Sequence, residues 1–314
     1  MTTVRSNPLR PALLAAARSP RIEATMSKLP ITRQLVERFV AGETEPEVVS
    51  AVADLLGSGR FVSVDYLGED TTDAAQATAT VDAYLSLLRA YSALDGAHRS
   101  LEVSVKLSAL GQGIDRSLAI ENARTICAAA DGAGVWVTVD AEDHTTTDST
   151  LSIVRELRRE FPDLGTVLQA YLKRTEEDCR SLSGHRSRIR LCKGAYNEPE
   201  SVAFQKPADV SDSYVRCLAV LMEGQGYPMV ATHDPQMIDA AGGLAKTTGR
   251  TPDSYEFQML YGIRDAEQRR LVGAGNTVRV YVPYGDQWYR YFMRRLAERP
   301  ANLMFFLRSL VSRH

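Results

Sequence analysis

Two adjacent arginines, Arg294 and Arg295, are the strongest chemical feature of the chain. They follow residues 277–282, where valines alternate with polar and aromatic residues as in a strand. On a helical period, Tyr291 and Glu298 share the stripe of the two arginines. Two guanidinium groups on one helix face can hold a small carboxylate through paired hydrogen bonds, which one lysine cannot do. The alternative is a solvated charged face in which an Arg–Glu pair contributes little energy.

A lysine and an aspartate fall in two strand-like segments, residues 102–107 and 135–140. In both segments valines alternate with other residues, which places Lys106 and Asp140 on the face that points away from the flanking helices. Because burying an unpaired charge is costly, we expect these two side chains to pair. A structural ion pair and a catalytic ion pair fit this pattern equally well.

Further polar residues occur in or after later strand-like segments. Arg190 lies in mid-strand and is soon followed by Lys193 and Gly194, where a glycine lets the backbone approach a ligand. This arrangement suits an anionic or electron-rich cofactor. Gln169 lies in a neighbouring segment, and its amide can both donate and accept hydrogen bonds. His233 ends the segment at residues 229–233. A lone histidine at the end of a strand is more often a structural residue than a base.

These residues must be positioned by a regular framework. Strands that alternate with helices over about 250 residues predict a (β/α)8 barrel, and a doubly wound sheet is the alternative. In a barrel, the C-terminal ends of the strands meet at one mouth, where chemistry gathers. The predicted strands are residues 61–66, 102–107, 135–140, 166–172, 188–192, 229–233, 255–259 and 277–282, and the predicted helices include residues 74–92, 117–130, 148–160, 210–223 and 265–272.

Composition limits the class of protein. The 314 residues have a formal net charge of −2 and a pI of about 6.3, which gives no basic footprint for nucleic acid. The four cysteines have no metal-ligand spacing, so we expect neither a metal site nor a disulfide framework. A reducing, cytoplasmic setting follows. No run of 18 apolar residues is present, so no ordinary membrane span is predicted.

The two ends of the chain are predicted to differ from its middle. We interpret residues 1–50 as an N-terminal helical arm and residues 51–314 as a catalytic barrel with a C-terminal helix. Residues 303–311 are apolar nearly all round, so this helix could pack on the barrel, join subunits or touch a membrane surface. The sequence leaves these alternatives and the oligomeric state open.

In combination, the segments resemble the proline dehydrogenase family, of the monofunctional bacterial type. The similarity is collinear from about residue 60 to residue 302, which makes it far more specific than any single piece. The matching motifs are DYLGE at 65–69, SVKLSAL at 104–110, DAE at 140–142, LQAYLKR at 168–174, RLCKGAY at 190–196, ATHD at 231–234, EFQMLYGI at 256–263 and the strand–helix segment at 277–302.

The resemblance implies a distorted (β/α)8 TIM-type barrel that binds FAD noncovalently. The implied reaction is oxidation of L-proline to Δ1-pyrroline-5-carboxylate, the first step of proline catabolism to glutamate, with electrons passed to a membrane quinone. A cyclic secondary amine has no easily ionised C–H bond, so an electron sink such as a flavin is chemically reasonable. Quinone use adds peripheral contact with the inner face of the cell membrane to the expected partners.

The resemblance also implies roles for individual residues. Arg294 and Arg295 look like the clamp for the substrate carboxylate, with Lys106 as a third cation and Asp140 as the acid that pairs with Lys106. Glu69 resembles a gate partner of Arg294, and Glu298 supports the arginine helix. Tyr281, Leu260 and Tyr291 look like walls of the proline pocket, Arg190 looks like the cation beside the flavin, and the other flavin-binding positions are Gln169, Cys192, Lys193, Gly194, Ala195, Tyr196, Thr232, His233 and Asp234.

Two departures limit this transfer of roles, and Tyr281 is informative in the opposite sense. The family commonly has Asn where this chain has Asp234, which puts an amide-specific contact to the cofactor in doubt. Cys192 stands where valine is usual, a small change that should be tolerated. The phenol of Tyr281 would crowd a hydroxyl group on the substrate ring, which favours proline over hydroxyproline.

Two rival functions fit part of the same pattern. One is another flavin barrel, such as a methylenetetrahydrofolate-reductase-like enzyme or a dehydrogenase for a different cyclic amino acid. The other is a noncatalytic barrel that senses proline by binding its carboxylate. A yellow protein that bleaches anaerobically with L-proline separates the enzyme from the binding module.

Overall fold

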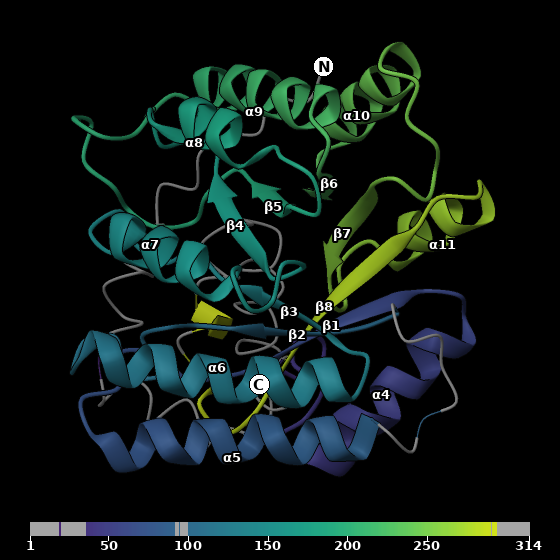
Figure 1. Cartoon of the computed structure of the whole chain (residues 1–314). Helices are drawn as coiled ribbons and strands as arrows, with labels where there is room; N and C mark the ends of the chain where they lie inside the picture. Colours follow the sequence, from purple (N-terminus) through teal and green to yellow (C-terminus); the bar gives the residue numbers. More distant parts are fainter. Residues whose placement is uncertain (1–18, 20–35, 92–93, 95–99, 290, 294–314) are drawn as a thin grey trace, which may run out of the picture.

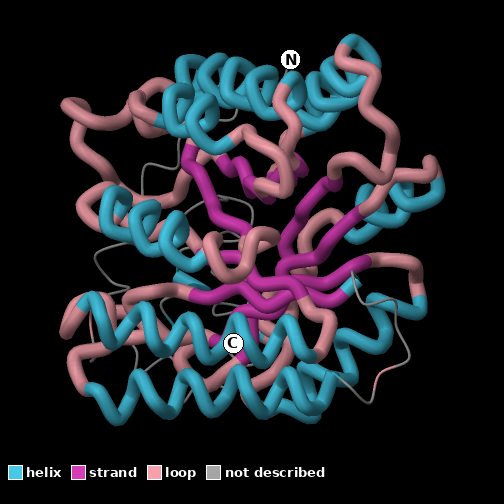
Figure 2. Tube along the Cα trace, viewed as in Figure 1, coloured by secondary structure: helices cyan, strands magenta, loops and turns pink. Residues whose placement is uncertain are grey.

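The predicted strands close into a barrel. The computed structural model describes residues 19, 36–91, 94, 100–289 and 291–293. In these residues β1 to β8 run parallel in sequence order and β1 pairs with β8, so the predicted (β/α)8 barrel is confirmed and the doubly wound sheet is excluded. Figure 2 shows the strands inside a surround of helices. The strands are β1 (Phe61–Tyr66), β2 (Leu101–Val105), β3 (Trp136–Val139), β4 (Gly165–Gln169), β5 (Arg188–Cys192), β6 (Tyr227–Ala231), β7 (Glu256–Leu260) and β8 (Val278–Tyr284).

Among the elements that the structure describes, α4 lies before the first strand, and α5 to α11 connect consecutive strands (Figure 1). α4 packs against β1 and β8, so it covers the seam where the barrel closes. The predicted boundary at residue 50 therefore falls inside a helix that packs on the barrel. The helices are α4 (Glu45–Gly57), α5 (Ala74–Tyr91), α6 (Arg116–Gly132), α7 (Thr147–Leu157), α8 (Thr175–Leu182), α9 (Pro207–Glu223), α10 (Pro235–Thr247) and α11 (Asp265–Gly273).

The hydrophobic core lies between the barrel and its helices. Val62 and Val64 of β1 are fully buried in one apolar cluster, which also holds residues of α4, α5 and α6. A second cluster joins β4 to β7 with α8, α9 and α10. Because side chains alternate along a strand, placing the apolar residues outside turns Ser63 and Asp65 toward the barrel axis. The barrel interior is therefore polar.

The end of β8 differs from its predicted position. The sequence predicts a strand that ends before Pro283, but β8 continues through Pro283 to Tyr284. Proline lacks an N–H group, yet it can stay in a strand where its neighbours need only its carbonyl. Here the Pro283 carbonyl accepts a hydrogen bond from the amide of Ala41 at 2.9 Å. The segment before α4 is thereby attached to the end of the strand.

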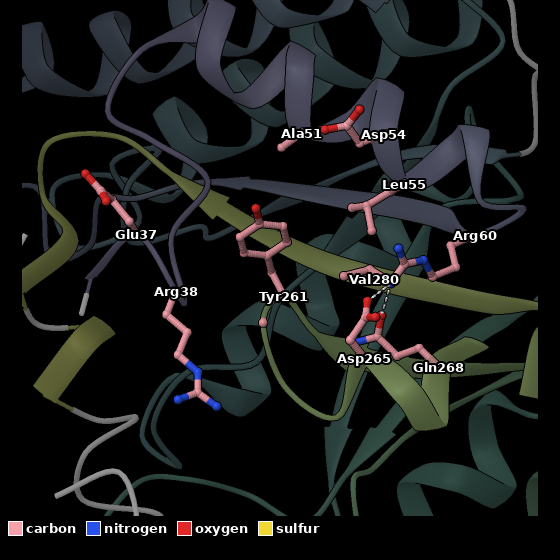
Figure 3. A pocket seen from close by; sticks show the side chains of 11 residues that line it. Glu37, Arg38, Ala51, Asp54, Leu55, Arg60, Tyr261, Asp265, Gln268 and Val280 are labelled. Carbon is pink, nitrogen blue, oxygen red and sulfur yellow. Dashed lines mark hydrogen bonds and ion pairs between the residues drawn. The ribbon is translucent and has the colours of Figure 1, made fainter. Parts of the chain in front are cut away.

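A pocket of about 310 Å³ lies outside the barrel, between α4 and the β7–α11 region (Figure 3). Arg60 points into it and donates hydrogen bonds to Asp265 and, at 2.8 Å, to Gln268. These bonds connect the start of β1 to α11, so the buried guanidinium already serves the fold. Among the described residues, no helix is both long and apolar enough to cross a membrane.

Candidate functional site

The floor of the barrel, at the N-terminal ends of the strands, is filled by paired charges. Arg279 contacts both carboxylate oxygens of Glu256 at 2.8 and 3.0 Å, and Arg188 contacts Glu102 at 2.5 Å. The guanidinium of Arg188 also lies 3.6 Å from the ring centre of Trp136, a cation–π contact. Glu102, Glu256 and Arg279 are fully buried. We call Glu102, Arg188, Glu256 and Arg279 the floor cluster.

The mouth of the barrel, at the C-terminal strand ends, holds a second group of charges. Lys106 contacts both carboxylate oxygens of Asp65 at 2.6 Å and lies 3.6 Å from Asp140. The Tyr281 hydroxyl donates to Asp140 at 2.8 Å and lies 3.4 Å from the Lys106 ammonium. The structure therefore brings Lys106, Asp140 and Tyr281 together, as the sequence predicts. We call Asp65, Lys106, Asp140 and Tyr281 the mouth cluster.

The electrostatics of the mouth cluster fix the protonation states of Lys106 and Tyr281. Burial alone would lower the pKa of Lys106, but the carboxylates of Asp65 and Asp140 outweigh burial and raise it. Burial and the Asp140 carboxylate both raise the pKa of Tyr281 well above its ordinary value. Lys106 is therefore a permanent cation, and the Tyr281 phenol remains a hydrogen-bond donor.

Arg190 of β5 connects the two clusters. Its guanidinium contacts Glu102 of the floor at 2.6 Å and Asp140 of the mouth at 2.8 Å. It also donates to Gln258 at 2.5 Å, and the remaining bonds go to the hydroxyl groups of Ser63 and Ser104. A side chain with this many partners has one available position. Arg190 is thus a fixed positive charge directly below the mouth.

The charges inside the barrel balance one another. In the floor cluster, the mouth cluster and Arg190 taken together, four cations form ion pairs with four carboxylates. A substrate carboxylate would therefore need further positive charge at the mouth. Arg294 and Arg295, which the sequence predicts for that task, lie outside the described residues, as does Glu298. Their assignment as a clamp stays a prediction.

The predicted walls of the substrate pocket pack together. Leu260 and Tyr281 are half-buried and contact an apolar cluster that contains Tyr291, Phe292 and Met293. Glu69, the predicted gate residue, lies in the loop after β1 and is close enough to raise the pKa of Lys106. These predicted residues thus lie on or directly after β7, β8 and β1, which are neighbours in the barrel.

The predicted cofactor residues line the opposite arc, at the ends of β4, β5 and β6. Residues 192–196 are all half-buried, although the strand before them is buried, so this segment borders open space. Gly194 has a φ of +108°. A Cβ atom there would lie 2.3 Å from the ring of Tyr171, so only glycine fits. The polar groups of this arc include the Gln169 amide, the Thr232 hydroxyl and the Lys193 ammonium, a set that suits the carbonyl, hydroxyl and phosphate groups of a flavin nucleotide. In the structure the Gln169 amide donates to the Glu142 carbonyl, and Lys193 donates to Ser211 and Asp234.

Two predicted cofactor residues have structural partners. His233 accepts a hydrogen bond from the Leu260 amide at its Nε2 atom, at 2.9 Å. Asp234 caps α10 by accepting from the Gln236 amide, and its other oxygen contacts Lys193 at 2.8 Å. The Lys193 contact and the cap hydrogen bond outweigh burial and lower the pKa of Asp234. The carboxylate thus binds the very lysine that was predicted to face the cofactor.

Sequence reasoning missed three residues at the mouth. Asp65 is the closest partner of Lys106, and Glu142 and Ser108 are joined by a hydrogen bond of 2.7 Å. Strand alternation in β1 carried a signal for Asp65, because it places this residue on the same face as Ser63. Glu142 and Ser108 lie in loops, where no such periodicity exists.

Comparison with known proteins identifies related sequences. The proline dehydrogenase family model matches residues 48–308. Proline dehydrogenase of Deinococcus radiodurans is 41% identical over 311 residues, which cover 96% of this chain and 97% of that protein. Proline dehydrogenase 2 of Bacillus subtilis strain 168 is 37% identical over 282 residues, 90% of this chain and 92% of that protein.

A solved structure shares the fold. Proline utilization A (PutA) from Bdellovibrio bacteriovorus, inactivated by N-propargylglycine, superposes with a TM-score of 0.80 at 24% sequence identity. The match covers 94% of this chain and 35% of that longer chain. This similarity supports the barrel architecture.

Proposed function

Because this chain belongs to the proline dehydrogenase family, we propose that it oxidises L-proline to Δ1-pyrroline-5-carboxylate with bound FAD and passes the electrons to a quinone. This reaction is the first step of proline catabolism to glutamate. The observation that carries the proposal is the mouth cluster: Lys106, held by Asp65 and Asp140, lies beside Tyr281 and above Arg190. Fixed charges beside an apolar wall suit a small amino acid with one carboxylate and an apolar ring.

We assign the substrate carboxylate to Lys106 together with Arg294 and Arg295. Since the interior charges cancel without those two arginines, they would supply the net positive charge that a bound carboxylate requires. Leu260, Tyr281 and Tyr291 would contact the ring methylenes, and Glu69 would close the site by pairing with Arg294. Tyr281, which donates to Asp140 at 2.8 Å, is held in place and would exclude a ring hydroxyl.

The cofactor is assigned to the arc formed by Gln169, residues 192–196, Thr232, His233 and Asp234. A flavin bound there would supply a two-electron acceptor. Arg190 would stabilise negative charge that develops near it, because it is a preorganised cation with a fixed position. Asp234 shares Lys193 with the cofactor site, so its carboxylate would reduce the attraction of that lysine for phosphate.

We further propose that the protein works at the cytoplasmic face of the cell membrane. The support is chemical: a quinone acceptor is dissolved in the membrane, so the protein must approach the lipid surface to transfer electrons. Peripheral contact would suffice. Reoxidation of the proline-reduced protein by a short-chain quinone, at a rate well above that with NAD⁺, is the expected result.

A spectroscopic experiment tests the proposed function. Purified protein should be yellow or become yellow after reconstitution with FAD, and the flavin absorbance should bleach anaerobically on addition of L-proline. D-proline and trans-4-hydroxy-L-proline are the comparison ligands, and both should bleach it far more slowly. A flavin-loaded protein that L-proline does not reduce would contradict the proposal, and a protein that binds no flavin would favour a binding module.

The carboxylate clamp has its own prediction. Arg295→Met should cost roughly 1.5–3 kcal/mol of substrate binding, the usual energy of hydrogen bonds to a charged group. The effect should appear mainly in KM, measured by steady-state kinetics. Arg116→Met, on the outer surface of α6, is the control for loss of an arginine. An unchanged KM in the Arg295 variant would refute the clamp.

A further inference from the structure

Glu142 is a carboxylate at the mouth of the barrel that forms no ion pair among the described residues. It lies two residues after Asp140, in the loop that follows β3, and it is half-buried. Its Oε1 atom accepts a hydrogen bond from the Ser108 hydroxyl at 2.7 Å, and its main-chain carbonyl accepts from the Gln169 amide at 2.7 Å. Among the described residues it forms no ion pair, and its hydrogen-bond donors are the hydroxyl and the amide of Ser108. The carboxylate is therefore held by one neighbouring residue and by no cation.

The neighbouring carboxylates are fully engaged. Both oxygens of Asp65 contact Lys106. Asp140 accepts from Ser104 and Arg190 at one oxygen and from Tyr281 at the other, which also faces Lys106. A proton placed on either residue would displace a donor from a charged hydrogen bond, at a cost of about 1.5–3 kcal/mol. Glu142 can accept a proton without separating from a cation, because it forms no ion pair among the described residues.

The surroundings of Glu142 prepare it for proton exchange near neutral pH. Burial raises its pKa to about 7, and the charge of Glu69 adds to this rise. The Ser108 hydrogen bond and the charge of Lys106 act in the opposite direction. A carboxylate that is ionised just above neutral pH and partly open to the mouth has the properties of a general base.

The proposed reaction needs such a base. At neutral pH the ring nitrogen of L-proline is a secondary ammonium, which has no lone pair. Loss of hydride from the adjacent carbon is favourable only when a nitrogen lone pair can form the C=N double bond. Resting on the proposed function, we infer that Glu142 is the general base that deprotonates the ring nitrogen of the bound amino acid.

The step balances in protons and electrons. The N–H bond breaks, its electron pair stays on nitrogen, and the proton forms an O–H bond with the Glu142 carboxylate. The C–H bond then breaks and its hydrogen leaves with both electrons as a hydride, which turns the substrate into the cyclic iminium; a bound flavin would supply the two-electron acceptor for this hydride. Glu142 returns its proton to solvent through the mouth before the next turnover.

Ser108 connects this base to the loop that carries Glu69. Its hydroxyl oxygen accepts from the Asp70 amide at 3.2 Å, and its carbonyl accepts from the Thr71 amide at 3.3 Å. Asp70 has a φ of +57°, so this loop has a specific, unusual backbone conformation. Ser108 thus sets both the position of the Glu142 carboxylate and its basicity, which makes it a positioning residue.

The test uses the flavin-loaded protein and measures the rate of anaerobic flavin reduction by L-proline from pH 5.5 to pH 9. The wild type should lose rate below about pH 7, where Glu142 is protonated. Glu142→Gln should lower the limiting rate by roughly 10²- to 10⁴-fold, the usual contribution of a general base, and should abolish this acidic limb. Ser108→Ala removes a hydrogen-bond donor that lowers the pKa of Glu142. In this variant the loss of rate at low pH, the acidic limb of the profile, should therefore begin at a higher pH than in the wild type.

A binding measurement distinguishes a general base from a residue that only supports the structure of the site. L-tetrahydrofuran-2-carboxylate has a ring oxygen in place of nitrogen, so it has no proton to give, and Glu142→Gln should bind it within about twofold of the wild type. Asp143→Asn is the matched control from the same loop, because its amide oxygen can keep the bonds from Thr145, and it should keep the wild-type profile.

Distinct results would overturn the inference. A Glu142→Gln variant that keeps a rate within about threefold of the wild type, or keeps the acidic limb, shows that Glu142 is not the base. If that variant does not fold, an unshifted limb in Ser108→Ala refutes the inference instead. Wild-type protein that carries flavin but is not reduced by L-proline overturns the proposed function itself, which is a different result from a reducible protein whose rate is independent of Glu142.

Discussion

The floor and the mouth of the barrel are built from the same kinds of side chain, yet they differ in access and in pairing. Glu102, Glu256 and Arg279 of the floor are 0% exposed, and each carboxylate contacts a guanidinium. At the mouth, Lys106 is 7% exposed and Glu142 is half-buried and forms no ion pair among the described residues. Sealed charges that pair with one another can only hold the strands together. An accessible carboxylate that no cation holds can also exchange protons with a ligand.

The same difference reverses the direction of the pKa shifts. Burial would raise the pKa of Glu102, but Arg188, Arg279 and Arg190 outweigh it and lower the pKa below its usual range. Burial raises the pKa of Glu142 to about 7 because the opposing Ser108 and Lys106 interactions are weaker than burial. Three guanidinium groups, and not depth alone, therefore set the direction of the pKa shift at Glu102.

The largest expected effect comes from breaking a pair in the floor. Glu256→Leu leaves the Arg279 guanidinium buried without its carboxylate, which should lower the free energy of unfolding by about 3–5 kcal/mol. Urea denaturation at pH 7 measures this change. The double variant Glu256→Leu/Arg279→Met removes both charges and should be less destabilised than the two single changes added together. A Glu256→Leu protein as stable as the wild type would show that the floor pair is dispensable.

The second-largest effect is expected when the Asp65–Lys106 pair of the mouth cluster is broken. Asp65→Asn keeps the shape of the side chain but removes the charge that holds Lys106 from both oxygens. Lys106 should turn toward Asp140, and misplacement of a substrate-positioning group by about 1 Å can cost 10²-fold in rate. We expect kcat/KM for L-proline to fall by about 100-fold, measured by steady-state kinetics.

A floor variant is the control for this mouth variant. The folded fraction of Glu256→Leu should keep kcat within about threefold of the wild type, because Glu256 bonds to Arg279, Gln258 and Tyr227 and contacts no residue of the mouth cluster. If Asp65→Asn kept full kcat/KM while Glu256→Leu lost it, the division between a structural floor and a functional mouth would be wrong.

Much of this arrangement could be predicted from the sequence, because local periodicity determines it. The alternation of apolar with polar residues along the strands correctly places Lys106, Asp140, Arg190 and Tyr281 inside the barrel. The partners of these residues depend on strand register, which local patterns do not contain. Arg188 and Glu102, for example, are 86 residues apart in the sequence and meet only because the barrel closes.

Other features escape sequence analysis for different physical reasons. Asp65 lies beside Lys106 because β1 pairs with β2 in a register that sets Asp65 opposite Ser104. Pro283 stays in β8 because a tertiary contact uses its carbonyl, a circumstance that propensity cannot reveal. Glu142 is in a loop, and only its three-dimensional surroundings distinguish it from the exposed acid beside it, Asp143.

The smallest predicted effect concerns pH and sharpens the contrast between the two carboxylates. The pKa of Glu142 is about 7 in the folded protein and near 4.5 in the unfolded chain. Between these values the folded state binds more protons, so wild-type stability should fall as the pH rises from 5 to 8. Because the side chain is partly solvated, we expect about 1–2 kcal/mol of this fall to be absent in Glu142→Gln.

Glu102→Gln is the matched variant for a carboxylate whose pKa is lowered, and not raised, by folding. Since the pKa of Glu102 is lowered by folding, its stabilisation is complete above the unfolded pKa and is lost only as the pH falls through the folded value. Between pH 5 and pH 8, Glu102→Gln should therefore be destabilised by a constant amount, whereas the difference between Glu142→Gln and the wild type changes. Urea unfolding at pH 5, 6, 7 and 8 compares the three proteins. Parallel curves for Glu142→Gln and the wild type would mean that Glu142 is as inert as the floor, because a carboxylate whose pKa folding leaves unchanged adds no pH dependence to stability.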